Sequence, residues 1–268
     1  LSVNIVCIGG GPAGLYFAIL MKRRNPAHRV RVVERNKKND TFGFGVVFSD
    51  ATLENLANAD PVSFQAITEN FSHWDDIDVH YQGRCIRSSG HGFSGLSRQK
   101  LLSILEDRCE ELGVELQFET DVQSLDAYDD ADLVVLADGV NSRFRQMHAD
   151  AFQPDVREAS NRFVWMGTTR RFPAFTFYFN ENEHGLWRVH AYNYDDEHST
   201  FIVECTEETW RRAGLEHATE DENIAYCEAL FAEELEGHRL LKNRSIWRSF
   251  PHVSCGRWSY ENRVLVGD

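Results

Sequence analysis

The sequence predicts an α/β protein: a parallel sheet flanked by helices, with an inserted α+β domain built on an antiparallel sheet. Two observations lead to this prediction. As far as about residue 145, short apolar runs alternate with helical segments, as in parallel α/β folds. From about residue 160 the strand-like runs are aromatic-rich and separated by turn residues, which is typical of antiparallel sheets.

The first elements form a strand–helix–strand unit. The run Val3–Ile8 is mostly apolar and is followed by glycines, as expected for a strand buried on both faces. Pro12 suits the first turn of a helix, where its missing N–H is not needed, and apolar residues follow at helical spacing. Val30–Glu34 predicts the next buried strand.

The later elements follow from caps, turns and apolar runs. In the first part we expect two short helices between 50 and 70, a hairpin over 79–88, a helix over 97–111, and strands over 114–119 and 133–137. In the second part we expect strands over 163–169, 175–179, 187–192 and 200–205, a capped helix from Thr219 to about Glu236, and a last strand over 263–267.

Because the last strand has α/β character again, the first domain is expected to be discontinuous. It comprises residues 1–75, 96–150 and 255–268, and the sheet domain, which is to hold the substrate, comprises 76–95 and 151–254.

Composition excludes several classes of function. The 268 residues include 42 acidic and 28 basic side chains, so the net charge of −14 argues against binding of nucleic acid. No apolar stretch is long enough to span a membrane, and no signal peptide precedes the first strand. The six cysteines form no C-x-x-C pair, and no histidine or carboxylate cluster has metal-ligand spacing. We therefore expect reduced thiols, no metal centre and a cytoplasmic location, while the oligomeric state stays open.

A glycine pattern, Gly9-x-Gly11-x-x-Gly14, follows the first strand and opens the first helix. In this context it predicts a Rossmann-like dinucleotide site, with the pyrophosphate on the N–H groups that begin the helix. Glu34 lies 20 residues beyond Gly14, where a carboxylate can accept hydrogen bonds from an adenosine ribose. The expected cofactor contacts also include Pro12, Ala13 and Arg35. Spacing alone does not choose between NAD and FAD.

A strand running into Asp138-Gly139, and a chain end at Gly267-Asp268, join the glycine pattern. With these motifs the whole chain resembles the single-component flavoprotein aromatic hydroxylases, which share the p-hydroxybenzoate hydroxylase fold. The resemblance implies a Rossmann-like FAD-binding domain with an inserted antiparallel β-sheet substrate domain. It implies FAD contacts at Asp138, Gly139, Ser142, Arg145, Gly267, Asp268 and Arg98.

A narrower resemblance is carried by Phe42–Leu53, Phe71–Val79 and Ser89–Phe93. It points to the branch that holds the salicylyl-CoA and 2-aminobenzoyl-CoA monooxygenases and the tryptophan hydroxylase of violacein synthesis. The aryl-CoA members resemble the chain most, through Val47–Leu53. The chemistry implied is reduction of FAD by NADH or NADPH, then hydroxylation of an aromatic ring through a flavin C4a-hydroperoxide.

Three residues are candidates for assisting the reaction: His190, Tyr192 and His91. His190 and Tyr192 alternate in a predicted strand and so point to one face, while His91 lies in a glycine-flanked loop. The alternative is that they are ordinary sheet or surface residues. The basic residues Arg157, Arg162, Arg170 and Arg171 either meet the phosphates of a CoA-linked substrate or form a solvated face.

Other functions stay open alongside hydroxylation of a small aromatic substrate, free or linked to CoA. One is a related flavoenzyme of the same fold, such as a reductase or an enzyme of indole-type substrates. Another is a catalytically incomplete FAD-binding fragment, because we expect the chain to be truncated after residue 268, directly behind Gly267-Asp268.

Overall fold

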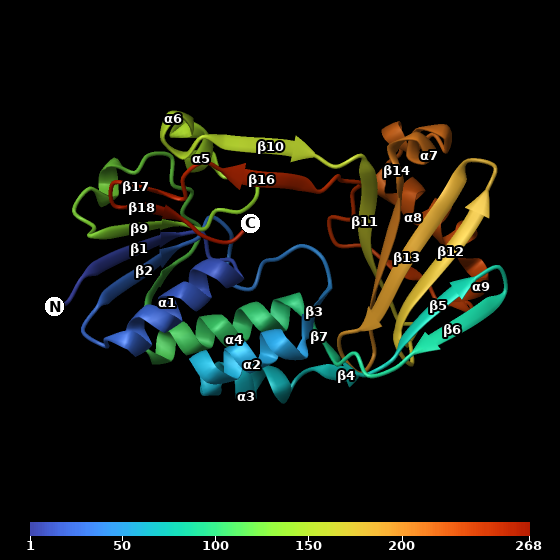
Figure 1. Cartoon of the computed structure of the whole chain (residues 1–268), viewed down its shortest axis with the longest axis horizontal. Helices are drawn as coiled ribbons and strands as arrows, with labels where there is room; N and C mark the ends of the chain where they lie inside the picture. The colour runs from blue at the N-terminus through green and yellow to red at the C-terminus, as the bar shows by residue number, and fades with distance from the viewer.

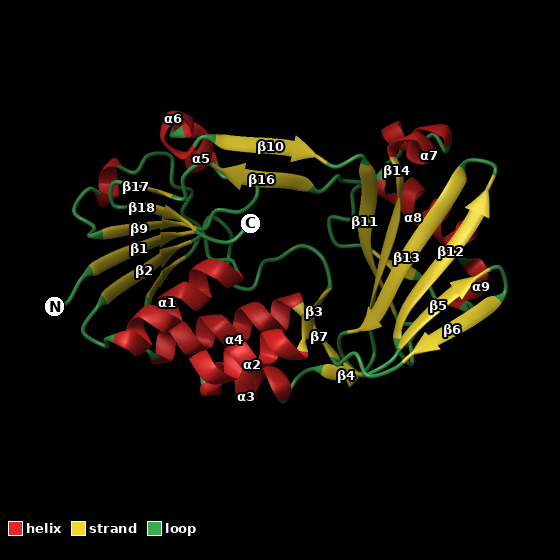
Figure 2. Ribbon diagram, viewed as in Figure 1, coloured by secondary structure: helices red, strands yellow, loops and turns green.

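Six strands form the sheet of the first body, in the order β17-β18-β9-β1-β2-β8 (Figure 2). The structure is a computed structural model that describes residues 1–268. The strands span Asn4–Ile8 (β1), Arg29–Val33 (β2), Glu115–Gln117 (β8), Leu133–Leu136 (β9), Ser259–Tyr260 (β17) and Arg263–Leu265 (β18). All neighbours are parallel except β17 and β18. The predicted parallel α/β arrangement is confirmed.

Helices cover this sheet on both faces. They span Pro12–Arg24 (α1), Arg98–Glu111 (α4), Arg143–Met147 (α5) and Ala149–Phe152 (α6). Ile5 and Cys7 of β1 share a core with α1 and α4, whereas Val6 and Ile8 belong to the core on the opposite side. Because successive side chains of a strand point to opposite faces, a strand covered on both sides needs a continuous apolar run. This requirement explains the sequence of β1.

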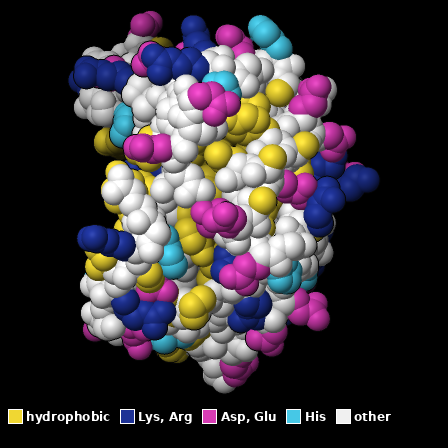
Figure 3. All heavy atoms as spheres, turned by 90° about the vertical axis from the view of Figure 1, so that its right-hand side faces the viewer, with side chains coloured by type: hydrophobic (Ala, Val, Ile, Leu, Met, Phe, Trp, Pro, Cys, Tyr) yellow, Lys and Arg dark blue, Asp and Glu magenta, His cyan; other side chains and the backbone are white.

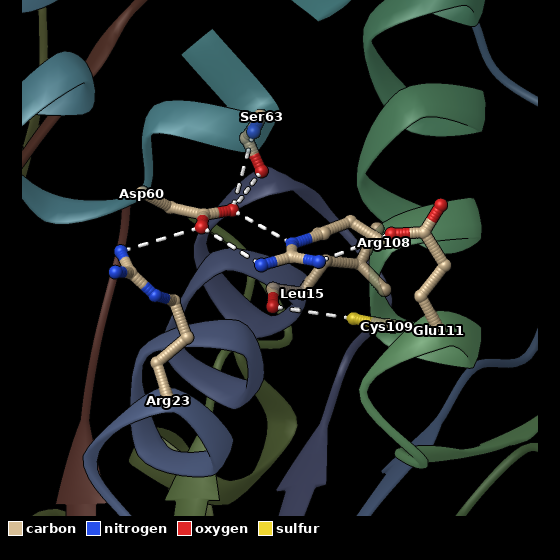
Figure 4. Close-up of polar contacts among 7 residues, drawn as sticks. All are labelled: Leu15, Arg23, Asp60, Ser63, Arg108, Cys109 and Glu111. Atoms are coloured by element: carbon tan, nitrogen blue, oxygen red, sulfur yellow. Dashed lines mark hydrogen bonds and ion pairs between the residues drawn. The ribbon is translucent and has the colours of Figure 1, made fainter.

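A buried carboxylate ties three helices of the first body together (Figure 4). Asp60 lies between α2 (Asp50–Ala59) and α3 (Pro61–Thr68), and it caps α3 by accepting hydrogen bonds from the Ser63 amide and hydroxyl at 3.2 and 2.5 Å. Arg108 of α4 donates to both carboxylate oxygens at 3.0 and 3.1 Å, and Arg23 of α1 lies 3.3 Å away. Burial alone raises the pKa of Asp60, but the bonds from Arg108 and Ser63 hold it below its usual value.

The second body is a seven-stranded sheet in the order β15-β11-β14-β13-β12-β5-β6. Its strands span Ile77–Tyr81 (β5), Arg84–Ser88 (β6), Asn161–Thr168 (β11), Phe175–Asn182 (β12), Gly185–Asn193 (β13), Ser199–Thr206 (β14) and Leu240–Leu241 (β15). β11 to β14 pair antiparallel, which confirms the predicted antiparallel sheet, while β5 joins β12 in parallel. The hairpin β5–β6 therefore reaches this sheet from the first half of the chain.

Helices cover one face of the seven-stranded sheet. They are α7 (Glu207–Arg212), α8 (Glu220–Leu230) and α9 (Ala232–Leu235). Val164, Val189 and Val203 are fully buried on this face. The helix expected from Thr219 to about Glu236 is present but interrupted, because α8 ends at Leu230 and α9 continues to Leu235. The chain leaves helical geometry at Phe231, whose side chain is fully buried in the core under the sheet.

Two small sheets join the bodies (Figure 1). Above, the ribbon of β10 (Pro154–Glu158) and β16 (Pro251–Cys255) runs between them. Below lies the sheet of β3 (Gly45–Ser49), β7 (Phe93–Ser97) and β4 (Ser72–Trp74). β7 pairs with β3 and β4, so residues 93–95, which we expected in the sheet domain, lie in this connection instead. Neither small sheet follows from the sequence, because β10 is largely exposed and β4 has three residues.

The remaining helices are short 3-10 turns at Asp126–Tyr128 (η1) and Leu215–His217 (η2). No helix in the structure combines the length and apolar character needed to cross a membrane. All six cysteines are free thiols.

Candidate cofactor and substrate site

The glycine loop connects β1 to α1 at the carboxyl end of the parallel sheet, where α/β folds bind ligands. Gly9 has a φ of +111°, and a Cβ there would lie 2.1 Å from the carbonyl oxygen of Ala137. A Cβ on Gly14 would lie 2.1 Å from the carbonyl oxygen of Gly9. A Cβ on Gly11 would meet nothing within 4 Å. Gly9 and Gly14 are therefore required by chain packing, whereas Gly11 leaves open space beside the first N–H groups of α1.

Glu34 fastens this loop to the end of β2. One carboxylate oxygen accepts the N–H of Gly10 at 2.7 Å, and the other accepts the N–H of Asn36 at 2.8 Å. The carboxylate thus shapes the loop, and its remaining lone pairs are free to accept hydrogen bonds from a ribose. Arg35 follows directly and is exposed.

The Asp-Gly turn follows β9. One oxygen of Asp138 accepts the N–H of Arg143 at 3.0 Å, while the other is buried without a partner. Ser142 caps α5 by accepting the N–H of Arg145 at 3.1 Å, and the Arg145 guanidinium donates to the Val140 carbonyl. Ser142 and Arg145 are 2% and 3% exposed. We expected both to touch the cofactor; in the structure their hydrogen bonds lie inside the turn that positions Asp138, and Arg145 Nε is buried without a partner.

The chain end returns to the start of α1. Gly267 has a φ of +87°, and a Cβ there would lie 2.9 Å from the Cβ of Ala13. Arg98, the first residue of α4, donates from Nε to the Thr41 hydroxyl at 2.9 Å and lies over the Phe42 ring at 4.8 Å. Burial lowers the pKa of Arg98, and the negative charge of Asp268 opposes this change. Residues from four distant parts of the sequence thus surround one helix N-terminus.

These features fit a dinucleotide cofactor. A diphosphate needs backbone N–H donors that it can approach closely, and the loop offers them at the open position of Gly11. The hydroxyl groups of such a cofactor need hydrogen-bond acceptors, and the buried Asp138 oxygen has no partner in the protein. The Pro12 ring at the start of α1 removes no needed donor, because that position has no intrahelical partner.

The uncovered face of the seven-stranded sheet is aromatic. Phe175 and Phe177 of β12 lie opposite Tyr192 and His190 of β13 on this face, and Phe175, Phe177 and His190 are only partly buried. The Phe175 ring stacks on Tyr192 at 5.4 Å and on His190 at 6.1 Å. Phe93 of β7 stacks on the same ring at 5.6 Å. The face offers flat apolar surfaces with two titratable rings, His190 and Tyr192, among them.

The structure brings the three catalytic candidates into this cluster. His190 and Tyr192 stack on Phe175 directly, and His91 stacks on Phe93 at 6.3 Å. Burial lowers the pKa of His190 to about 4, so its imidazole is neutral near pH 7. His91 is exposed and lies 2.7 Å from the Ser88 hydroxyl through Nε2.

Tyr192 has a different role from the one expected. Its hydroxyl donates to the carbonyl of Gly45 at 2.7 Å, and the residue is 4% exposed. The ring also stacks on Trp74 of β4 at 5.9 Å. Tyr192 therefore holds the small sheet of β3, β4 and β7 against the large one, and its proton is committed to the protein.

The sequence did not single out Phe175, Phe177 or Phe93, although they form the centre of the aromatic cluster. The alternation of Phe175, Phe177 and Phe179 was the available signal, since a period of two marks one face of a strand. The contacts of Arg98 with Thr41 and Phe42 were also missed, because Phe42 was noted only for the resemblance and their loop has no periodic pattern.

Comparison with known proteins gives one family for the whole chain. The family model described as an FAD binding domain matches residues 2–268. The chain is 43% identical to salicyloyl-CoA 5-hydroxylase of Streptomyces sp, over 99% of this chain and 53% of that protein. It is 34% identical to protodeoxyviolaceinate monooxygenase of Chromobacterium violaceum, over 99% of this chain and 72% of that protein.

A third relative is the 3-hydroxy-4-methyl-anthranilyl-[aryl-carrier protein] 5-monooxygenase of Streptosporangium sibiricum, 34% identical over 99% of this chain and 71% of that protein. The chain thus spans about half of the first of these relatives and about 70% of the other two. Among solved structures, 2-methyl-3-hydroxypyridine-5-carboxylic acid oxygenase matches with a TM-score of 0.81 at 17% identity, over 100% of this chain and 75% of that one. This last match concerns the fold.

Proposed function

Since the chain belongs to the family of FAD-binding domains, we propose that it serves as an FAD-dependent, NAD(P)H-using monooxygenase that hydroxylates an aromatic ring. The observation that carries the proposal is the partly buried aromatic face of the seven-stranded sheet, with Phe175, Phe177 and His190 at its centre. A flat substrate ring gains apolar contact and offset stacking on such a surface.

The proposed substrate is an aromatic acid carried as a thioester. Two relatives are named for aryl-CoA and aryl-carrier-protein substrates, which supports this class. Phosphates of a CoA or carrier arm need positive charge against the net charge of −14. Arg248 lies over the Phe42 ring at 5.4 Å without a carboxylate partner, so it is our candidate for that contact.

The arginines expected for this contact from the sequence are mostly engaged elsewhere. Arg157 pairs with Asp155 at 2.7 Å, and Arg162 pairs with Glu207 at 3.3 Å. Arg170 pairs with Glu236 at 2.7 Å. Only Arg171 of that group has no ion pair.

FAD, when bound, supplies the redox chemistry: it takes electrons from NAD(P)H and transfers one atom of O₂ to the ring. The protein would hold its diphosphate at Gly11 and the N-terminus of α1. Glu34 and Asp138 would accept hydrogen bonds from its hydroxyl groups, and Arg98 would contact it from α4. Gly267, which approaches Ala13, and Asp268 would complete the site.

His190 is the proposed group for orienting the substrate ring. A neutral imidazole has one nitrogen that accepts a hydrogen bond, and a ring hydroxyl or amino group can donate to it. Its stacking on Phe175 fixes the imidazole plane. His91 remains a second proposed group, at the outer end of the same cluster.

The direct test uses the purified chain loaded with FAD. With salicyloyl-CoA we expect NADH or NADPH oxidation to accelerate and the product mass to rise by one oxygen, labelled when ¹⁸O₂ is supplied. Free salicylate and an indole substrate serve as comparison compounds. Oxidation of NAD(P)H that yields only hydrogen peroxide with every aromatic would overturn the proposal.

A matched pair of variants tests the role of the aromatic face. His190→Phe keeps a flat ring against Phe175 but removes the acceptor nitrogen, so we expect unchanged FAD binding and kcat lower by about 10²-fold. His184→Phe makes the same change outside that cluster, where the His184 ring lies 6.4 Å from the Tyr226 ring of α8, and we expect it to leave kcat unchanged. Equal effects of the two variants would contradict a role for His190.

A further inference from the structure

Three side chains with metal-binding atoms lie together on the hairpin β5–β6. His80 of β5 lies directly opposite Cys85 of β6, and Asp78 is two residues before His80 on the same face. The imidazole, thiol and carboxylate ligand atoms all lie within 4.8 Å of one another. We expected no metal centre, because no histidine or carboxylate cluster in the sequence has metal-ligand spacing; the hairpin turn at Gln82-Gly83 brings these three residues together.

We propose that Asp78, His80 and Cys85 bind a divalent cation of the zinc class. One imidazole, one thiolate and one carboxylate are ligands that zinc accepts together, with a fourth position left for water. Ligand atoms of a tetrahedral zinc site lie about 3.5 Å apart, given bonds of about 2.0–2.3 Å. The present separations, up to 4.8 Å, exceed that spacing by at most about 1.3 Å.

Neighbouring contacts hold two of the ligands in place. The His80 ring packs against the Tyr178 ring at 4.7 Å with the planes tilted by 34°, and the lone pair of its unprotonated nitrogen lies in the imidazole plane. Asp78 accepts two hydrogen bonds from Arg87, both at 2.7 Å. Each carboxylate oxygen has two lone pairs, so a cation can share one oxygen while Arg87 remains bound and orients the group. Arg87 also lies 3.5 Å from Asp76, which gives its charge a second partner.

The site opens into a cavity of about 590 Å³ between this hairpin and α9. His80 and Cys85 line the cavity, and Cys85 is exposed. The wall also carries four carboxylates, Glu181, Glu233, Glu234 and Glu236, against two arginines, Arg84 and Arg170. Figure 3 looks onto this end of the molecule, where acidic and histidine side chains lie among apolar ones. The excess of carboxylates favours entry of a cation.

Cation binding breaks one covalent bond of the protein, the S–H bond of Cys85. The Cys85 thiol loses its proton to solvent, and its sulfur pair forms the bond to the cation, without any change of oxidation state. Since β5 pairs with β12, whose Phe175 and Phe177 belong to the aromatic face, the cation fixes a strand next to that face. This binding does not depend on the proposed monooxygenase activity.

The test titrates the chelator-treated, thiol-reduced full chain with Co²⁺ and then with Zn²⁺. We expect one Co²⁺ per chain, a sulfur-to-cobalt charge-transfer band, and loss of the band when Zn²⁺ displaces Co²⁺. Cys85→Ser should abolish the band, and His80→Phe, which keeps a ring against Tyr178, should weaken binding at least about tenfold. Cys255→Ser removes the other cysteine that is not buried and should change nothing.

Two results would overturn the proposal: the absence of a charge-transfer band in the unaltered chain, or a band that survives Cys85→Ser. Melting curves of the metal-free variants check that each is folded. A raised Tm on adding Zn²⁺ to the unaltered chain and to Cys255→Ser, but not to Cys85→Ser, supports it independently.

Discussion

Replacing Gly11 by alanine separates cofactor binding from folding. The backbone of Gly11 has a φ of −73°, which alanine adopts readily, and the added Cβ meets no atom of the protein within 4 Å. We therefore expect the free energy of unfolding of the cofactor-free chain to change by less than about 1 kcal/mol. The methyl group instead occupies the space that a diphosphate must enter.

The size of the binding defect follows from that geometry. A Cβ extends the backbone by about 1.5 Å, which is enough to move a phosphate out of hydrogen-bond reach of the N–H groups of α1. Each hydrogen bond to a charged group contributes about 1.5–3 kcal/mol. Losing one or two of them costs about 3 kcal/mol, or about a 100-fold rise in Kd.

Gly14→Ala is the matched comparison. Its Cβ would lie 2.1 Å from the Gly9 carbonyl oxygen, so backbone must move and we expect a stability loss of about 2–3 kcal/mol. Urea unfolding of the cofactor-free proteins measures stability, and quenching of flavin fluorescence measures Kd. If Gly11→Ala bound FAD within threefold of the unaltered chain, the diphosphate would not lie at this loop, and the reasoning would be refuted.

Three further predictions concern stability. Asp60→Ala removes the cap of α3 and leaves Arg108, 15% exposed, without its main partner. In urea unfolding we expect the free energy of unfolding to fall by about 4 kcal/mol, against about 1 kcal/mol for Ser63→Ala; similar losses would contradict the bridging role of Asp60. The pKa of His190 falls from 6.5 to about 4 on folding, so the unfolded chain takes up a proton first as the pH drops, and the free energy of unfolding should decrease between these two values. His190→Phe should flatten this part of the pH–stability curve, and an unchanged slope would show that His190 is not its cause. Tyr192→Phe loses the bond to Gly45 and should lower the free energy of unfolding by about 1–2 kcal/mol, whereas an unchanged Tm would mean that the hydroxyl does not hold β3.

Much of the first body could be predicted from local sequence. A strand buried on both faces, a glycine turn and Pro12 at a helix start each have a physical cause within a few residues. The capping box at Thr219 is confirmed for the same reason, since both of its hydrogen bonds join Thr219 and Glu222. The break in that helix was not predicted, because burial of Phe231, a tertiary effect, interrupts it before α9 continues to Leu235.

The same distinction between local and tertiary causes applies to the residues of the site. Gly9, Gly11 and Gly14 could be assigned from spacing; the structure shows a steric requirement at Gly9 and Gly14 and open space at Gly11. Ser142 and Arg145 were assigned to the cofactor from a motif, whereas in the structure both are buried and hydrogen-bonded within the turn. A motif identifies a segment, whereas the orientation of each side chain depends on what packs against it.

Periodicity and neighbours along the chain were enough to establish the glycine loop, the fold class and the resemblance to flavoprotein hydroxylases. Other contacts come from the folded chain: Gly267 approaches Ala13, Phe175 stacks with His190 and Phe93, and the β5–β6 turn places His80 opposite Cys85. These contacts join residues whose separation in sequence carries no periodic signal. Strand pairing and register create them, because pairing selects which side chains share a face.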